Sequence, residues 1–280
     1  MRPTIELPDW LEARRPDDSL YADAYESTPA ELRALLKTAI AFSFHRWTNM
    51  DGEKREMRSC SRSGFCHSEN SRSADWVLAV LGSGFASPAR LLAALIPAII
   101  AGTGRILIVS EAPFTPSICT ALELAGLEDS FVMEGDCLHG LYEDLRSLSP
   151  DGRIAFFAKA DGSISSAQKT LMHAAALDGI PRLRDLPAPR ILSLHGAGSE
   201  AEKRLFWLHP DAEIFREAAP GLRTAFVPDA AACPRNAATS APFICGPGME
   251  ACWPGPSPEF YRTSSCSAFL FQENDPETLP

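Results

Sequence analysis

The sequence predicts an α/β protein built on a doubly wound, mostly parallel sheet, and three observations predict it. Short apolar runs alternate with longer helical stretches across Trp76–Gly135. The helical stretches begin with a capping residue followed by proline, in Ser87-Pro88 and Thr115-Pro116. The links are short, which favours right-handed crossovers between parallel strands. We expect a helical arm before this core and an irregular segment after it.

The elements of the predicted core follow in order along the chain. We expect strands at Trp76–Leu81, Arg105–Ser110, Ser130–Met133, Arg153–Lys159 and Arg190–Leu194. A helix should follow each of the first four strands, and the proline-rich link Pro181–Pro189 should introduce the fifth. This alternation of strands and helices predicts one sheet covering about 76–195.

The flanking segments differ in composition from the core. Residues 1–26 are polar and contain prolines, so we expect either an extended arm or a segment that contacts a partner. Thr28-Pro29-Ala30-Glu31 begins a helix to about Trp47. Asn49–Ser73 is too polar to bury much, so we expect a loop or a crossing that enters the core. The predicted domains are therefore 1–75, a helical arm and polar loop; 76–195, a Rossmann-like nucleotide-binding domain; and 196–280, a small segment packing on it.

Composition excludes several classes of function. The 280 residues carry a formal net charge of −10, which argues against nucleic acid or an anionic membrane as a partner. Leu91–Ala101, the longest apolar run, is too short to span a bilayer, and Met1–Tyr21 lacks the apolar core of a secretory signal. We therefore expect a cytoplasmic protein with no membrane contact. The polar arm and thin C-terminal segment favour a homodimer, because such pieces often pack on a second copy.

The eight cysteines are expected to be reduced in a long chain without a signal. Cys60, Cys66 and His67 form the tightest thiol cluster, but their spacing is poor for zinc. A loop that happens to contain cysteines is the simpler interpretation, and a redox-responsive pair is the alternative.

Candidate ligand-binding residues follow the predicted strands, at the sheet edge where ligands of such folds lie. Gly82, Ser83 and Gly84 follow the first strand, and Ser87 opens the next helix, where backbone can approach a diphosphate. The alternative is a tight turn that simply needs glycine.

Ser110 and Glu111 end the second strand, where an acid can hold the hydroxyls of a ribose. The alternative for Glu111 is a solvated loop carboxylate. Gly135 follows the third strand at the same predicted edge. Together these residues predict a small-molecule nucleotide as the ligand.

The order of these motifs resembles the cofactor domain of the aldehyde dehydrogenase superfamily, and histidinol dehydrogenases are similar. The resemblance rests on Gly84-Phe85, Ile108-Val109-Ser110-Glu111, Ala121–Leu127 and Met133-Glu134-Gly135, and it continues through Arg153–Phe157 and Asp161-Gly162-Ser163. Near the C-terminus, Gly246-Pro247 and Ser257–Ser264 look like the closing segment of histidinol dehydrogenases.

The resemblance implies binding of NAD or NADP, with Glu111 near the adenosine ribose and Ser163 near the diphosphate or nicotinamide end. It also implies a dehydrogenase of the histidinol or aldehyde type. Aldehyde dehydrogenases have a lysine just before the Ser-Glu pair and a Gly-Gln-x-Cys motif that carries the nucleophile, and both are absent from this sequence. The Gln-x-x-His pair of histidinol dehydrogenases is absent as well.

An aldehyde oxidation needs a thiolate. Cys233 lies at a plausible distance after Asp211, and the other candidates are Cys245 and Cys252. An inert, packed cysteine is the alternative for each. Two hypotheses therefore stand: an NAD(P)-dependent oxidoreductase, and a catalytically inactive relative that acts as a binding or assembly module. The spacing of the six histidines predicts no metal site.

Overall fold

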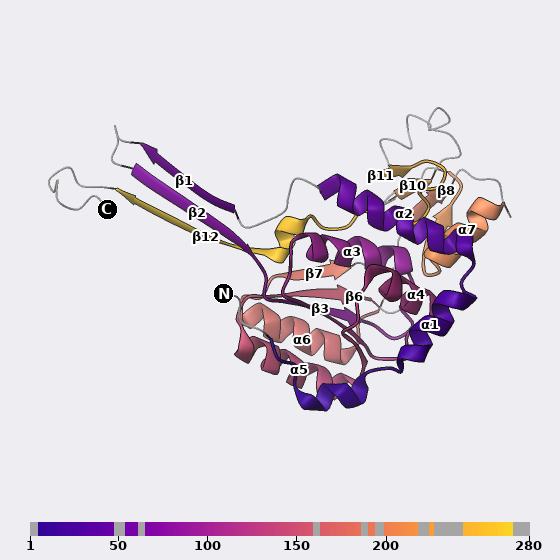
Figure 1. The fold of residues 1–280 in the computed structure, drawn as a ribbon, viewed down its shortest axis with the longest axis horizontal. Helices are drawn as coiled ribbons and strands as arrows, with labels where there is room; N and C mark the ends of the chain where they lie inside the picture. The colour runs from indigo at the N-terminus through magenta and orange to yellow at the C-terminus, as the bar shows by residue number, and fades with distance from the viewer. Residues whose placement is uncertain are drawn as a thin grey trace.

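The computed structural model describes residues 5–47, 54–60, 65–158, 163–185, 190–193, 199–217, 224–226 and 243–270. These residues form two parallel sheets with their helices and a separate three-stranded antiparallel arm (Figure 1). Among them, no helix is long and apolar enough to cross a membrane.

The central sheet has five parallel strands in the order β5-β4-β3-β6-β7. The strands are β3 (Trp76–Leu81), β4 (Arg105–Ser110), β5 (Ser130–Val132), β6 (Gly152–Phe157) and β7 (Arg182–Asp185). The chain starts in the middle, runs outward to β5, returns to β6 and runs outward again. This order confirms the predicted doubly wound sheet and places its switch point between β3 and β6.

Four helices cover the two faces of the central sheet. They are α3 (Pro88–Ile100), α4 (Pro116–Ala125), α5 (Gly135–Leu148) and α6 (Ser166–Leu177). One apolar cluster joins the sheet to α3 and α4, and a second joins its other face to α5 and α6. The predicted start signal of α3 is confirmed, because the Ser87 hydroxyl accepts a hydrogen bond from the Arg90 N–H at 3.4 Å. Gly126 ends α4 with φ of 65°.

The second sheet has four parallel strands in the order β11-β10-β8-β9. Its strands are β8 (Arg190–Ser193), β9 (Glu213–Phe215), β10 (Thr224–Phe226) and β11 (Phe243–Cys245). The prediction that 190–194 completes the central sheet is therefore wrong. That place belongs to β7, which lies within the supposed link 181–189. Alternation of strands and helices does not show which sheet a strand joins, and this is the source of the error.

Helix α3 is shared by the two sheets. Twelve of its 13 residues are buried, as expected for a helix that is apolar on all sides. Leu91 and Leu95 pack toward the central sheet, whereas Leu92 and Ile96 pack with the second sheet and with α2 (Ala30–Trp47) and α7 (Glu200–Leu208).

An ion pair inside the protein reinforces this junction. Arg90 of α3 pairs with Asp211, and their side chains are only 1% and 4% exposed. The Arg90 guanidinium also lies 5.2 Å from the centre of the Phe85 ring. Nearby, the Ser87 hydroxyl donates to the Leu208 carbonyl at 2.9 Å. The start of α3 is therefore fixed to the segment between α7 and β9.

Residues 5–27, here called the strap, wrap around the edge strand β5. They contain a 3₁₀ helix, η1 (Asp9–Arg14), and α1 (Asp18–Ser27). Ile5 and Leu11 are buried with the α5–α6 face, whereas Ala24 is buried with the α3–α4 face. The prediction of an extended arm is therefore wrong, because this segment is helical and packs on its own sheet. Contact of the segment with a partner stays a prediction.

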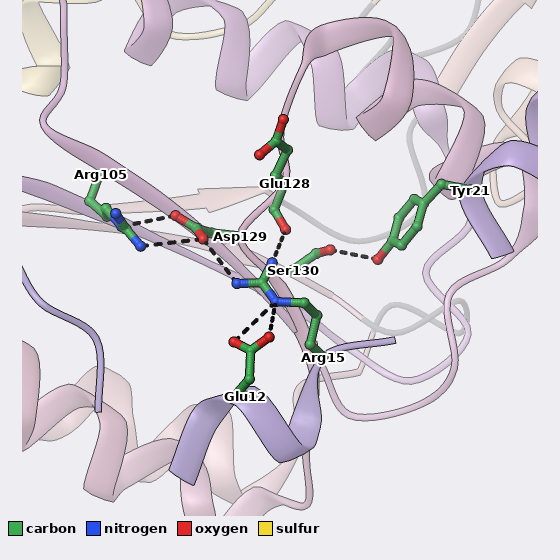
Figure 2. Close-up of polar contacts among 7 residues, drawn as sticks. All are labelled: Glu12, Arg15, Tyr21, Arg105, Glu128, Asp129 and Ser130. Carbon is green, nitrogen blue, oxygen red and sulfur yellow. Dashed lines mark hydrogen bonds and ion pairs between the residues drawn. The ribbon is translucent and has the colours of Figure 1, made fainter. Parts of the chain in front are cut away.

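Polar contacts hold the strap against β5 (Figure 2). The Arg15 guanidinium donates to the Glu128 carbonyl at 2.6 Å and pairs with Asp129 at 3.4 Å. Its plane lies 5.1 Å from the centre of the Phe131 ring. The hydroxyls of Tyr21 and Ser130 are 2.5 Å apart. These contacts join the strap to side chains of β5 and to the two residues that precede it.

The antiparallel arm projects from the body in Figure 1. It contains β1 (Lys54–Cys60), β2 (Phe65–Ser73) and β12 (Arg262–Leu270), with β2 in the middle. The prediction of a polar loop over 49–73 is therefore wrong where β1 and β2 lie, because these strands lack the apolar alternation by which strands are recognised. A short 3₁₀ helix, η4 (Pro258–Tyr261), precedes β12.

Candidate functional site

The carboxyl edge of the central sheet carries the glycine turn that follows β3. The Gly82 N–H donates to the Phe157 carbonyl at 2.9 Å, and the Gly82 carbonyl accepts from the Phe85 N–H at 3.0 Å. Ser83 and Gly84 are exposed at the tip of the turn. Gly84 has φ of 78°, a conformation that favours glycine. The tip therefore presents backbone next to the switch point between β3 and β6.

Glu111 lies at the same edge, immediately after β4. Its N–H donates to the Leu81 carbonyl at 3.3 Å, which keeps the residue beside the end of β3. Its carboxylate accepts a hydrogen bond from the Ser165 hydroxyl. Ser165 is the N-cap of α6, so the structure joins the acid after β4 to the start of the helix after β6.

Gln168 fixes the start of α6 above the switch point. Ser165 and Gln168 form a capping box. The buried Gln168 amide also donates to the carbonyls of Val80 and Phe157, at 3.3 and 3.1 Å. The sequence prediction included neither Ser165 nor Gln168 among the site residues. The Ser-x-x-Gln spacing was the signal that could have identified them.

Several predicted site residues serve the fold itself. Ser87 is fully buried, and its hydroxyl bonds Leu208 and the first turn of α3. Ser110 is 5% exposed and donates to the Ala112 carbonyl at 2.5 Å. A Cβ atom on Gly135 would lie 2.6 Å from the Ala167 Cβ, so this glycine allows α5 and α6 to approach.

Of the remaining predicted residues, only Ser163 has a described side chain. Ser163 is exposed just before the start of α6, on the same edge as Glu111. Cys233 lies outside the described residues. The side chains of Cys60, Cys66 and His67 also lie outside the description. Their strand register places Cys60 opposite Phe65 and Cys66 opposite Ser59.

The two other candidate nucleophiles are packed inside the protein. Cys245 and Cys252 are 3% and 2% exposed. Burial raises the pKa of the Cys252 thiol to about 12 and raises the pKa of Cys245 further. Both thiols are therefore protonated near neutral pH, which favours the inert interpretation. No group of three or more His, Cys, Asp or Glu side chains within the described ranges is arranged to hold a metal ion.

A buried histidine lies near the junction of the two sheets. His209 is fully buried, and its Nε2 lies 3.0 Å from the Glu250 carbonyl. The rings of Phe226 and Trp253 lie 5.8 and 5.2 Å from the imidazole. Burial lowers the pKa of His209 to about 4, so the ring is neutral and Nε2 donates to Glu250.

The central sheet is a doubly wound parallel α/β sheet, and a search of solved structures finds a similar fold. Histidinol dehydrogenase from Elizabethkingia anophelis matches at 12% identity with a TM-score of 0.57, over 92% of this chain and 77% of that one. This likeness shows the fold, which is the fold expected from the sequence resemblance.

Other matches are weaker. Lactaldehyde dehydrogenase from Escherichia coli matches at 16% identity with a TM-score of 0.38, over 74% of this chain and 46% of that one. An NAD-dependent benzaldehyde dehydrogenase from Corynebacterium glutamicum matches at 14% identity with a TM-score of 0.34, over 75% and 55%. The chain thus spans about half the length of these two enzymes. No family model matches the sequence, and no curated protein matches it significantly.

Proposed function

We propose that this chain binds NAD or NADP across the carboxyl edge of its central sheet. The observation that carries the proposal is the contact between Glu111 and Ser165, which joins the acid after β4 to the start of α6. The exposed Ser83–Gly84 turn lies at the end of β3. In the sheet order β3 stands between β4, which precedes Glu111, and β6, which precedes α6. In doubly wound sheets this edge is where nucleotides bind.

Each of these groups has a role that its chemistry supports. The Glu111 carboxylate can accept hydrogen bonds from the hydroxyls of a ribose. The absence of a Cβ at Gly84 allows a diphosphate to approach the backbone. The first turn of α6 has N–H groups and a dipole that favour an anion, and Ser163 lies beside it. The adenosine end of the nucleotide would therefore lie over β4 and the diphosphate over β3 and β6.

Oxidoreduction of the histidinol or aldehyde dehydrogenase type is the finer form of this proposal. Cys233 is its candidate nucleophile. The burial of Cys245 and Cys252 favours a second candidate, a catalytically inactive relative that binds the nucleotide as a binding or assembly module. Reduction of NAD or NADP with a panel of aldehydes and alcohols separates the two. Turnover that disappears in Cys233→Ser supports the enzyme, whereas nucleotide binding without turnover supports the module.

The melting temperature with NAD, NADP or coenzyme A at millimolar concentration tests the binding. We expect NAD or NADP to raise it, because a ligand that binds only the folded state stabilises that state. Glu111→Ala should abolish the shift. Glu123→Ala, which removes an exposed carboxylate near the far end of α4, is the matched control and should preserve it. The absence of a shift in the unmodified protein would contradict nucleotide binding.

We also propose that the protein is a cytoplasmic homodimer without a nucleic-acid or membrane partner. The net charge of −10 supports the proposed lack of a nucleic-acid or membrane partner. Sedimentation equilibrium tests the dimer, and a monomer at micromolar concentration would contradict it. Cell fractionation tests the location, and recovery of the protein with membranes would contradict it.

A further inference from the structure

A groove of about 650 Å³ lies between the start of the strap and the end of α5. Leu7, Pro8 and Trp10 of the strap line one side, and Leu148, the last residue of α5, lines the other. Helix α5 follows β5 and runs back toward the amino edge of the central sheet, where β6 begins. The groove therefore lies at the opposite end of the sheet from Glu111 and from the proposed nucleotide site.

The apolar row of α5 continues beyond the point where the protein covers it. Leu138, Leu141 and Leu145 are buried at the spacing of one helix face. Leu148 is the next residue of that row, yet it is 47% exposed. On the strap side of the groove, Trp10 is 38% exposed. The groove thus leaves a large apolar side chain open to solvent on each of its two sides.

The strap side of the groove is a fixed part of the fold. Ile5 and Leu11, on either side of it in the sequence, are 5% and 1% exposed and belong to the apolar cluster beneath α5 and α6. Between them, the Trp10 indole N–H donates to the Asp144 carboxylate of α5 at 3.2 Å. These contacts orient the indole before a partner arrives, which reduces the entropy lost on binding.

Negative charge surrounds these apolar side chains. The described residues that line the groove include the carboxylates of Glu6, Asp9 and Asp144, and they include no lysine or arginine. The charge continues along the strap, where a second pocket of about 580 Å³ lies between the strap and the end of α4. Five more carboxylates line that pocket: Glu12, Asp18, Glu123, Glu128 and Asp129. Its cation, Arg15, is already paired with Glu12 and Asp129.

We propose that the groove binds a cationic, apolar segment of another protein. A large apolar side chain of this segment would contact Trp10 and Leu148, and flanking lysine or arginine side chains would pair with Glu6 and Asp9. Complementary charge selects such a partner and excludes an acidic one. The face of an indole also attracts a cation directly. The net charge of −10 argues against a second copy in the groove, because two copies repel each other.

Two short synthetic peptides test the proposal on the unmodified chain. Both carry a central pair of leucines, flanked by lysines in one peptide and by glutamates in the other. Fluorine NMR of protein labelled with fluorotryptophan follows Trp10, whose resonance is assigned from Trp10→Phe. We expect the lysine peptide to shift this resonance, and added salt to weaken its binding, because salt screens the attraction. The glutamate peptide should leave the resonance in place.

Calorimetric titrations of variants assign the binding to the groove. Trp10→Ala should weaken binding of the lysine peptide about tenfold or more, through loss of its main apolar contact. The double variant Glu6→Gln with Asp9→Asn should weaken it about threefold to tenfold at low salt, through loss of the charge attraction.

Two matched controls should bind the lysine peptide normally. Phe206→Ala removes an exposed aromatic ring from α7, far along the chain from the groove. The double variant Asp23→Asn with Glu26→Gln removes the same amount of charge from exposed residues of α1, outside the groove.

Three results would overturn the proposal. The lysine peptide could leave the Trp10 resonance unshifted, or both peptides could bind equally, which would show that charge selects nothing. Sedimentation equilibrium gives the third: a dimer of the unmodified chain that Trp10→Ala converts to a monomer would put a second copy in the groove. None of these results depends on NAD, so the proposed nucleotide function stands or falls separately.

Discussion

The ion pair between Arg90 and Asp211 provides a quantitative test of how the two sheets are joined. Both side chains are almost completely buried, and the pair connects α3 to the segment before β9. Asp211→Asn keeps the shape of the side chain but removes the carboxylate charge that pairs with Arg90 in the interior. Removal of one partner from a buried pair costs about 3–5 kcal/mol of folding free energy.

Equilibrium denaturation in urea measures this effect, because it gives the free energy of unfolding and the urea concentration at the midpoint of the transition. We expect Asp211→Asn to reduce the free energy by about 3–5 kcal/mol. The double variant Arg90→Met with Asp211→Leu should lose less free energy of unfolding than the single variant, because it removes both buried charges of the pair. Glu200→Gln breaks an exposed pair with Lys203 and should leave the midpoint unchanged. A loss below about 1 kcal/mol in Asp211→Asn would refute the reasoning.

Two further predictions concern buried titratable groups. The unfolded chain protonates His209 near pH 6.5 and the folded chain only near pH 4. Stability should therefore fall by up to about 3 kcal/mol as the pH drops through this window, and His209→Gln should lack this component in pH-dependent urea denaturation. Cys252, with its pKa raised to about 12, should resist alkylation at pH about 8 in the native protein and react on unfolding; fast native labelling by mass spectrometry would contradict its burial.

The local signals in the sequence predicted the central sheet well. Trp76–Leu81 and Arg105–Ser110 are apolar runs with clear limits, and Ser87-Pro88 and Thr115-Pro116 mark where the following helices start. These signals depend on neighbouring residues alone, so a single sequence contains them. The antiparallel arm lacks such signals, because β2 (Phe65–Ser73) is polar through most of its length and one of its two partners, β12, lies far away in the sequence.

The candidate site was predictable in part for the same reason. The position of Glu111 follows from the end of β4, which the apolar run defines. The burial of Ser87 depends on Leu208, 121 residues away, and therefore on how the second sheet packs against α3. The link between Glu111 and Ser165 likewise crosses 54 residues. Such contacts arise from tertiary packing and have no local signature in the sequence.

The strap has a consequence for the order of folding. It is synthesised before the strand it covers, since Arg15 must wait for Asp129, 114 residues later. Closing so large a loop is costly in entropy, so we expect β5 to form before the strap docks on it. Until it does, the uncovered edge can pair with other chains. We therefore expect the docked strap to limit such pairing in the folded protein.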